Sequence, residues 1–444
     1  MPYRPPELVD DRPGETDSTS PRAILVLLMA LAALCHFNRV SISVAGSERL
    51  MTEFSLSEEQ LGWIYSSYLV VYTLLMLPGG WLLDRFGPRT MMGVMGAGSA
   101  LFVGLTAVAG LPIVPISALA TLMLVRGALG AASVPMHPGA ANTVANWFAP
   151  ASRASANGLV TAAALVGIAL SYPLFGALID SVGWRAGMLI SSAVTGVVAL
   201  AWSIIARDRS AAVTTTTATT ERDSLAAKAA LPSHVTMPVA PRVAELQLTS
   251  LLLLTISYAA VGYFQYLFFY WSQYYFDHVL KLGTQKGRLA AMLLSLAMAA
   301  GMLGGGWLAA RLQSRWHPWR GLTLVPMIGM AAGAALTVVG VLVDWPAVTI
   351  ASFALAMAAV GMAEGPFWTA VVEVAGNRRG MAAAFFNTGG NIGGLLAPYA
   401  TPVISAWLGW QSGIALASLF CLIGAALWLW VRPAEAAQNL KRGL

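Results

Sequence analysis

Long apolar runs recur along almost the whole of this chain, and they constrain its fold more than any other feature. Each run is about twenty residues long, enough for a helix to cross a hydrocarbon core of roughly 30 Å. Composition agrees, because 57% of the 444 residues are apolar and only 10% are charged, against roughly 25% charged in a soluble domain. The sequence therefore predicts a polytopic helical membrane protein.

Charged residues, glycines and prolines divide the apolar sequence into twelve spans. We expect these spans near residues 24–46, 59–84, 90–110, 115–147, 152–180, 184–206, 246–280, 286–312, 320–342, 346–375, 380–407 and 410–432. The segment between the sixth and seventh spans contains the run TTTTATT and scattered charge, which is typical of a flexible linker.

The predicted fold class is thus all-α, with twelve transmembrane helices in two six-helix halves. The halves are residues 24–206 and 246–432, joined by a cytoplasmic linker at 207–245. A disordered cytoplasmic tail is expected at 1–23 and a second cytoplasmic tail at 433–444.

The distribution of basic residues predicts the orientation of the chain. With both termini and the linker inside the cell, 19 of the 26 Lys and Arg residues fall on the inner side and five on the outer side. Lys and Arg favour cytoplasmic loops, so this asymmetry supports a cytoplasmic (inner) membrane location with both termini in the cytoplasm. It also explains the net charge of +6 without a nucleic-acid partner.

The two halves share short motifs at a constant separation of 226 residues. Gly79-Gly80-Trp81-Leu82 recurs as Gly305-Gly306-Trp307-Leu308, Gly183-Trp184 recurs as Gly409-Trp410, and Gly167 recurs as Gly393. Each half has an even number of spans, so the repeats enter the membrane in the same direction. Transporters built from such parallel repeats bind their substrates near the bilayer midplane, between the repeats.

Two arginines lie within predicted spans, Arg39 in the first and Arg126 in the fourth. An ionised side chain at bilayer depth costs about 2.5 to 3.5 kcal/mol, which makes it a candidate functional group. Arg39 either snorkels toward the membrane surface or clasps a carboxylate in a central cavity. Arg126 either forms a structural ion pair or faces the substrate. Because the spans contain very few acids, an anionic substrate is the simplest partner for both.

Several stretches resemble the major facilitator superfamily of secondary transporters. Residues 79–89, GGWLLDRFGPR, are similar to that family's loop between spans two and three. Five further stretches resemble its anion:cation symporter branch, whose members carry sugar acids and other organic anions: Phe37-Asn38-Arg39 through Ala45, Arg126-Gly127 through Pro138, QYLFFYW from Gln265, Gly365-Pro366-Phe367-Trp368, and FNTGGNIGG from Phe386.

The resemblance implies a set of functional residues. Carried over by position, an organic-anion site would be lined by Arg39, Tyr72, Arg126, Gln265 and Asn391, and a cytoplasmic gate would contain Asp84, Arg85 and Arg89. Two further residues follow from their own positions. Trp368 is either a flat wall of the cavity or a packing residue, and Glu373 is a gate or interface charge near the cytoplasmic surface.

Two departures from the branch concern proton coupling. The Asp that usually precedes the span-one arginine is Asn38 here, and the usual span-four Glu is Ser133. Neither replacement titrates near neutral pH. The remaining coupling candidates are Glu364, His137 and His36, with a fixed counter-ion role open for Glu364 and a packing role open for the histidines.

These observations predict a secondary transporter for a small organic anion, a monocarboxylate such as a sugar acid, which works by alternating access. Proton symport, uniport and anion exchange stay open, as do a drug or cation exporter and a receptor that binds its ligand without moving it. Phosphate-binding loops, nucleophile elbows and metal-ligand spacings are missing from the sequence, so we expect neither an enzyme nor a metal or cofactor. We expect a monomer in the lipid bilayer.

Overall fold

A computed structural model describes residues 20–207, 241–315, 318–375 and 379–432. Within these ranges the chain is helical apart from short turns, and no described residue lies in a strand. The predicted tails and linker fall almost wholly outside the described residues, so their boundaries stay predictions.

The first half begins at α1 (Pro21–Ala45), which continues through the π-helical turn η1 (Gly46–Leu50) into the short α2 (Met51–Phe54). The remaining elements of this half are α3 (Glu58–Thr106), α4 (Ala118–Ser133), α5 (Met136–Trp147), α6 (Pro150–Leu170), η2 (Ser171–Phe175) and α7 (Gly176–Ile205). Ser57 caps α3, because its side chain accepts from the Gln60 N–H and the Gln60 side chain accepts from the Ser57 N–H.

The second half runs from α9 to α15. Its elements are α9 (Pro241–Tyr274), η3 (Tyr275–Val279), α10 (Thr284–Arg315), α11 (Pro318–Leu342), α12 (Pro346–Gly361), α13 (Glu364–Ala375), α14 (Arg379–Leu408) and α15 (Trp410–Leu427). The turn between α12 and α13 interrupts the predicted tenth span just before Glu364.

Glycines divide two of the long helical runs into separate spans. Nine helices within the described ranges are long and apolar enough to cross a membrane. Two of these runs are each broken once, at Gly87 (φ 78°, ψ 158°) and at Gly183 (φ 82°, ψ 161°), a backbone region that suits glycine because it has no Cβ. Together with the 30-residue α14, this gives twelve spans and confirms the predicted fold class.

The repeat seen in the sequence is also a structural repeat. Gly183 and its counterpart Gly409 share one backbone conformation, with φ/ψ of 82°/161° and 81°/157°. A Cβ added at Gly167 would overlap the carbonyl oxygen of Ala33, and one added at Gly393 would overlap that of Ala259. Ala33 and Ala259 are themselves 226 residues apart, so the two halves use the same close helix packing at equivalent places.

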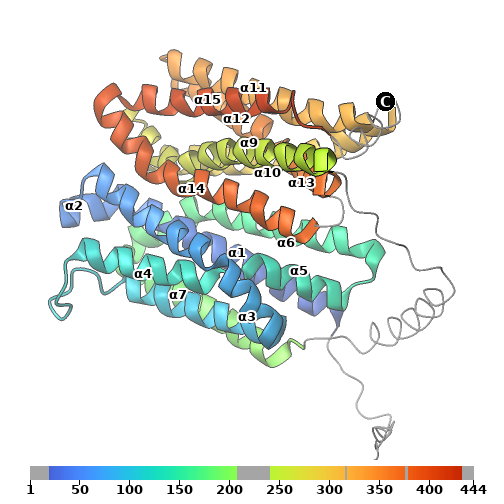
Figure 1. The fold of residues 1–444 in the computed structure, drawn as a ribbon. Helices are drawn as coiled ribbons and strands as arrows, with labels where there is room; N and C mark the ends of the chain where they lie inside the picture. The colour runs from blue at the N-terminus through green and yellow to red at the C-terminus, as the bar shows by residue number, and fades with distance from the viewer. Residues whose placement is uncertain (1–19, 208–240, 316–317, 376–378, 433–444) are drawn as a thin grey trace, which may run out of the picture.

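The halves form two layers of roughly parallel helices, with α1 to α7 in one and α9 to α15 in the other (Figure 1). Helix α3 packs against α14, and α6 packs against α10, across the boundary between the layers. We call the end at which α7 finishes and α9 begins the linker end, and the opposite end the far end.

Ion pairs and hydrogen bonds join the halves at the far end. Arg288 of α10 donates to both Glu48 oxygens, at 2.7 and 2.6 Å, and to Asp180 at 2.5 and 3.0 Å. Nearby, Glu58 at the start of α3 accepts from Tyr274 and, at 3.1 Å, from Trp410. The side chains of Arg288 and Glu48 are only 6% and 4% exposed, so this contact is a closed interface.

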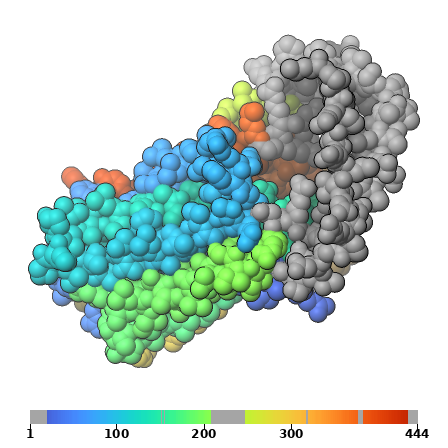
Figure 2. All heavy atoms as spheres, turned by 90° about the horizontal axis from the view of Figure 1, so that it is seen from below, coloured from blue at the N-terminus to red at the C-terminus, as the bar shows by residue number. Residues whose placement is uncertain are grey.

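Apolar side chains cover the outer face of the first half. Figure 2 shows this face, where α3 packs against both α4 and α7. Leu77, Leu124 and Val197 are examples of its large exposed apolar residues. A soluble monomer rarely exposes a continuous apolar surface of this kind, whereas a multi-pass membrane protein presents such a surface to lipid.

Replacing Arg288 with Met is expected to open the far end. The substitution leaves the buried Glu48 with the Gln273 amide as a donor but without a cation, and loss of one member of a buried ion pair costs about 3 to 5 kcal/mol. Ser66 reports on the opening, because its hydroxyl donates across the interface to the Leu395 carbonyl at 2.8 Å. In purified protein lacking Cys35 and Cys421, a cysteine at position 66 should react with maleimide several-fold faster in the Arg288→Met variant.

Arg185→Met is the matched control, because Arg185 pairs with Glu53 at 2.5 Å within the first half. That variant should leave the labelling rate at position 66 unchanged. Equal rates in the Arg288→Met variant and its parent would show that the ion pair does not hold the halves together.

Candidate ligand-binding pocket between the halves

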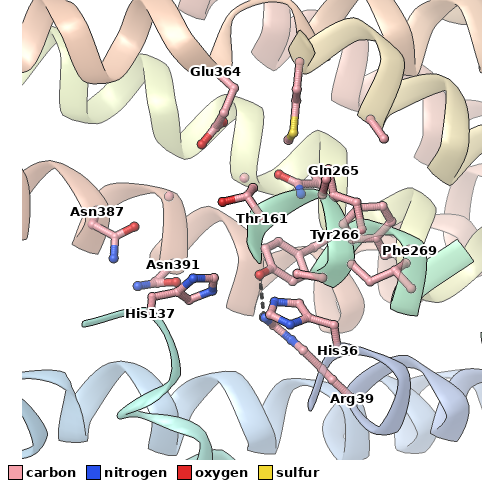
Figure 3. Close-up of a pocket in the computed structure, with 18 of the residues that line it drawn as sticks. His36, Arg39, His137, Thr161, Gln265, Tyr266, Phe269, Glu364, Asn387 and Asn391 are labelled. Carbon is pink, nitrogen blue, oxygen red and sulfur yellow. Dashed lines mark hydrogen bonds between the residues drawn. The ribbon is translucent and has the colours of Figure 1, made fainter. Parts of the chain in front are cut away.

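A cavity of about 510 Å³ lies between the two halves (Figure 3). Its wall contains residues of α1, α3, α5 and α6 from the first half and of α9, α10, α13 and α14 from the second. The volume lies within the roughly 300 to 1,000 Å³ that is usual for small-molecule sites. Of the nine residues expected to bind substrate or couple protons, eight line this cavity: His36, Arg39, Tyr72, His137, Gln265, Glu364, Trp368 and Asn391.

Arg39 is the charged centre of the first-half wall. Its side chain is 7% exposed and donates from Nη2 to the Tyr266 hydroxyl at 2.5 Å. Its guanidinium carbon lies 4.6 Å from the centre of the Tyr266 ring and 4.9 Å from that of Tyr68. Aromatic faces attract a guanidinium, and attract it more strongly away from water. The arginine is thus held in place by rings, which leave its charge uncompensated.

Arg126 lies behind Arg39 and does not line the cavity as described. It is 1% exposed, and it donates to the main-chain carbonyls of Asn38 at 3.0 Å and Arg39 at 2.6 Å. Carbonyl dipoles therefore take the place of a carboxylate partner. The arginine expected to face the substrate instead ties α4 to the segment of α1 that carries Arg39.

Asn38 and Ser133 are buried, and each donates one side-chain hydrogen bond within the first half. Asn38 donates to the Thr195 hydroxyl at 2.8 Å, and Ser133 donates to the Leu129 carbonyl at 2.7 Å. Each is 1% exposed. Asn38 thus links α1 to α7, Ser133 bonds within α4, and neither position offers a titratable group.

His36 and His137 form a pair beside Arg39 (Figure 3). Their ring centres are 5.4 Å apart and the rings meet edge to face. His36 Nδ1 lies 3.0 Å from the Ala32 carbonyl oxygen. A carbonyl only accepts, so Nδ1 carries a proton, and Nε2 of the neutral ring is left as an acceptor.

Glu364 enters the cavity from the second half, on the side opposite Arg39 (Figure 3). Its Oε1 accepts from the Tyr258 hydroxyl at 2.8 Å and from Trp368 Nε1 at 2.9 Å. Trp368 therefore has a polar role besides forming part of the wall. Gln265, Asn387 and Asn391 add amide groups to this side, and Asn391 also contacts Met76 Sδ at 2.9 Å.

The expected gate residues lie at the linker end, away from the cavity lining. Asp84 and Arg85 are exposed, and the Arg85 guanidinium lies 5.5 Å from the centre of the Trp81 ring. Arg89 donates to the Ser203 carbonyl at 3.2 Å, which joins the third and sixth spans. Glu373 is exposed on α13.

Tyr258 and Tyr266 were not predicted as site residues, although both contact the charged groups of the cavity. A signal for Tyr266 was present, because Tyr263, Tyr266 and Tyr270 fall at helical spacing on the seventh span. The repeat offers a second signal. Gln265 is the counterpart of Arg39 at the 226-residue separation, and both residues line the cavity.

Comparison with known proteins identifies the family. The family model described as Major Facilitator Superfamily matches residues 28–398 and 373–444. The chain therefore belongs to the Major Facilitator Superfamily, as its motifs predicted, and it is a multi-pass membrane protein of a family of transporters rather than enzymes.

Curated relatives and solved structures agree with this membership. The chain is 27% identical to a probable L-galactonate transporter of Escherichia coli (strain K12), over 76% of this chain and 72% of that protein. It is 30% identical to a D-galactonate transporter of Escherichia coli O6:H1, but this match spans only 39% of that protein.

Among solved structures, a bacterial homologue of the human lysosomal transporter Spinster superposes with a TM-score of 0.72 at 17% identity, over 96% of this chain and 99% of that one. The Escherichia coli xylose transporter XylE superposes with a TM-score of 0.68 at 17% identity, over 95% of this chain and 99% of that one. At 17% identity, these two similarities show that the fold is shared and nothing further.

Arg126→Met should reduce stability more than Arg39→Met. The first change removes two charged hydrogen bonds to carbonyls, each worth about 1.5 to 3 kcal/mol, and leaves those carbonyls without that donor. The second removes a cation that lacks a carboxylate partner. Thermal unfolding of the purified variants in detergent measures the difference. A melting temperature of Arg126→Met equal to that of Arg39→Met would contradict the positioning role of Arg126.

Proposed function

We propose that this protein is a secondary transporter that moves a small organic anion, a monocarboxylate such as a sugar acid, by alternating access. Arg39 carries the proposal. It lines the cavity, and no carboxylate among the described residues lies within 4.0 Å of its guanidinium. A ligand carboxylate is the partner that its geometry suits, because a guanidinium pairs with a carboxylate through two parallel hydrogen bonds. Relatives named as galactonate transporters support this substrate class.

Residues around Arg39 can hold the remainder of such a ligand. Tyr72 adds a phenol from α3, while Gln265 and Asn391 add amide groups from the second half. Amides both donate and accept, so they suit hydroxyl groups. Because the ligand would touch both halves, its binding is linked to their relative position.

Alternating access follows from closing one end of the cavity at a time. We assign the linker end to the cytoplasm of a cell whose cytoplasmic membrane holds the protein, in agreement with the excess of basic residues at that end. In the described state the far end is closed by the Arg288 cluster. The linker end carries the gate candidates Asp84, Arg85, Arg89 and Glu373. In the opposite state the halves would come together at this end.

We assign proton coupling to the His36–His137 pair, with Glu364 as the competing site and uniport or anion exchange as the uncoupled alternatives. The pair shares the Arg39 side of the cavity. A carboxylate bound to Arg39 places negative charge beside the two imidazoles, and a nearby negative charge favours proton binding. Anion and proton would then bind cooperatively, which is the requirement for symport.

Arg39→Met should abolish binding and transport of a sugar acid. Loss of a bidentate charged contact weakens affinity at least about tenfold. Galactonate or gluconate binding by purified protein, followed by uptake of the labelled acid into proteoliposomes, measures both effects. Arg315→Met is the control, because Arg315 is an exposed arginine at the end of α10. Undiminished uptake by the Arg39→Met variant would remove Arg39 from the site, and binding without uptake or exchange by the wild type would favour a receptor.

His137→Gln should uncouple transport from the proton gradient. The amide keeps polar contacts but has no proton to carry, so accumulation driven by an inward proton gradient should fall to the level without a gradient, while counterflow exchange continues. His278→Gln is the control, because His278 stacks on Tyr274 at the far end, 4.6 Å between ring centres. Gradient-driven accumulation that survives in His137→Gln but is lost in Glu364→Gln would assign coupling to Glu364 instead.

A further inference from the structure

The basic and acidic groups of the cavity lie on opposite sides. Arg39 and the histidine pair lie on the first-half side, and Glu364 lies on the second-half side (Figure 3). Glu364 is the acid among the described residues that line this cavity. A monocarboxylate bound to Arg39 balances the positive side and leaves the negative side as it was.

The hydrogen bonds of Glu364 are uneven. Its Oε1 accepts from both Tyr258 and Trp368, whereas its Oε2 is buried and has no hydrogen-bond partner among the described residues. A carboxylate has about four acceptor positions, so capacity remains unused. Tyr258 and Trp368 hold the group at the cavity wall while leaving one oxygen for another donor.

The charge of Glu364 also lacks a counter-ion. Within the described ranges, no Lys, Arg or His nitrogen lies within 4.0 Å of its oxygens. Arg39 is already engaged with Tyr266. An unpaired charge away from water is costly, so a cationic donor brought by the ligand would be strongly favoured at this place.

We propose that the preferred ligand is dipolar, with a carboxylate on Arg39 and an ammonium group on Glu364. This inference rests on the proposed function. It specifies the group that the same ligand carries opposite its carboxylate. Glu364 is then a specificity-determining residue: it attracts an ammonium, accepts from a hydroxyl and repels a second carboxylate. Amino-sugar acids and ω-amino acids belong to the favoured class, and dicarboxylates are excluded.

Three ligands with the same carbon chain test this selectivity. Gluconate, 6-amino-6-deoxygluconate and glucarate end in a hydroxymethyl, an ammonium and a carboxylate group, respectively. At pH 7, the wild-type protein should bind 6-amino-6-deoxygluconate most tightly and glucarate most weakly. The two dissociation constants should differ about tenfold. Pairs of ω-amino acids and fatty acids of equal length, from three to eight carbons, cover other spacings between the two charged groups.

Variants test whether Glu364 is the cause. In Glu364→Gln the preference for the ammonium ligand over glucarate should fall to within about twofold, while gluconate still binds through Arg39. Glu59→Gln is the control, because Glu59 is an exposed acid at the start of α3. Should Glu364→Gln fail to fold, Tyr258→Phe serves instead: it keeps the carboxylate and frees an acceptor position, so the ammonium preference should persist.

The outcomes separate this inference from the proposed function. Gluconate binding that depends on Arg39, with equal affinity for all three end groups and no ammonium preference in the ω-amino series, would overturn the dipolar ligand and leave anion transport standing. Glucarate binding as tight as that of the amino ligand would overturn it as well. A protein that binds none of these carboxylates would defeat both proposals.

Discussion

The two halves of this protein are joined at one end by a buried guanidinium that holds two carboxylates. Arg288 of the second half contacts Glu48 and Asp180 of the first, and the Tyr274–Glu58–Trp410 contacts lie beside it. Ion pairs of this kind lose much of their strength when water reaches them, so the contact favours an all-or-none closure. With the far end closed in this way, α3 packs against α14 across the boundary between the halves. A reversible polar contact suits this place better than a permanent apolar one, because the proposed alternating-access cycle requires the halves to separate here.

At the cavity, two arginines are held in place without ion pairs. Arg39 is held by tyrosine rings and Arg126 by main-chain carbonyls, and neither has a carboxylate partner among the described residues. A structural ion pair would neutralise these cations and hide them from a ligand. Rings and carbonyls fix their positions while leaving positive potential in the site. In the proposed anion site, the residues behind Arg39 therefore matter as much as Arg39 itself.

Most of the architecture could be predicted because lipid imposes simple rules on sequence. A span must be apolar and about twenty residues long, so the twelve spans were visible, and the shared separation of Gly167 and Gly393 already revealed the repeat. The cavity residues were harder. Arg39, His36, His137 and Glu364 were conspicuous as ionisable groups within apolar spans, whereas Tyr72, Gln265 and Asn391 were carried over from the family resemblance. Arg126 was misplaced because sequence does not show which face of a helix meets a neighbouring main chain, and Tyr266 was missed because tyrosine stripes are common in packed helices. The role of Arg288 depends on two residues far away in the chain, and no local pattern indicates it.

The site departs from the branch that the sequence resembles at two positions that bear on proton coupling. Asn38 and Ser133 occupy positions at which the resembling branch has acids. Here both make neutral hydrogen bonds, Asn38 to Thr195 of α7 and Ser133 to Leu129 of its own helix α4. Neutral residues at these two positions leave the positive charge of Arg39 uncompensated, which would favour binding of the proposed anion. In the proposed mechanism the histidine pair takes the coupling role, because a carboxylate bound to Arg39 would bring negative charge beside both imidazoles and favour proton binding there. Glu364 lies on the opposite wall, so a carboxylate bound to Arg39 would not place negative charge beside it. We therefore assign its carboxyl group to choosing the ligand rather than to sensing it.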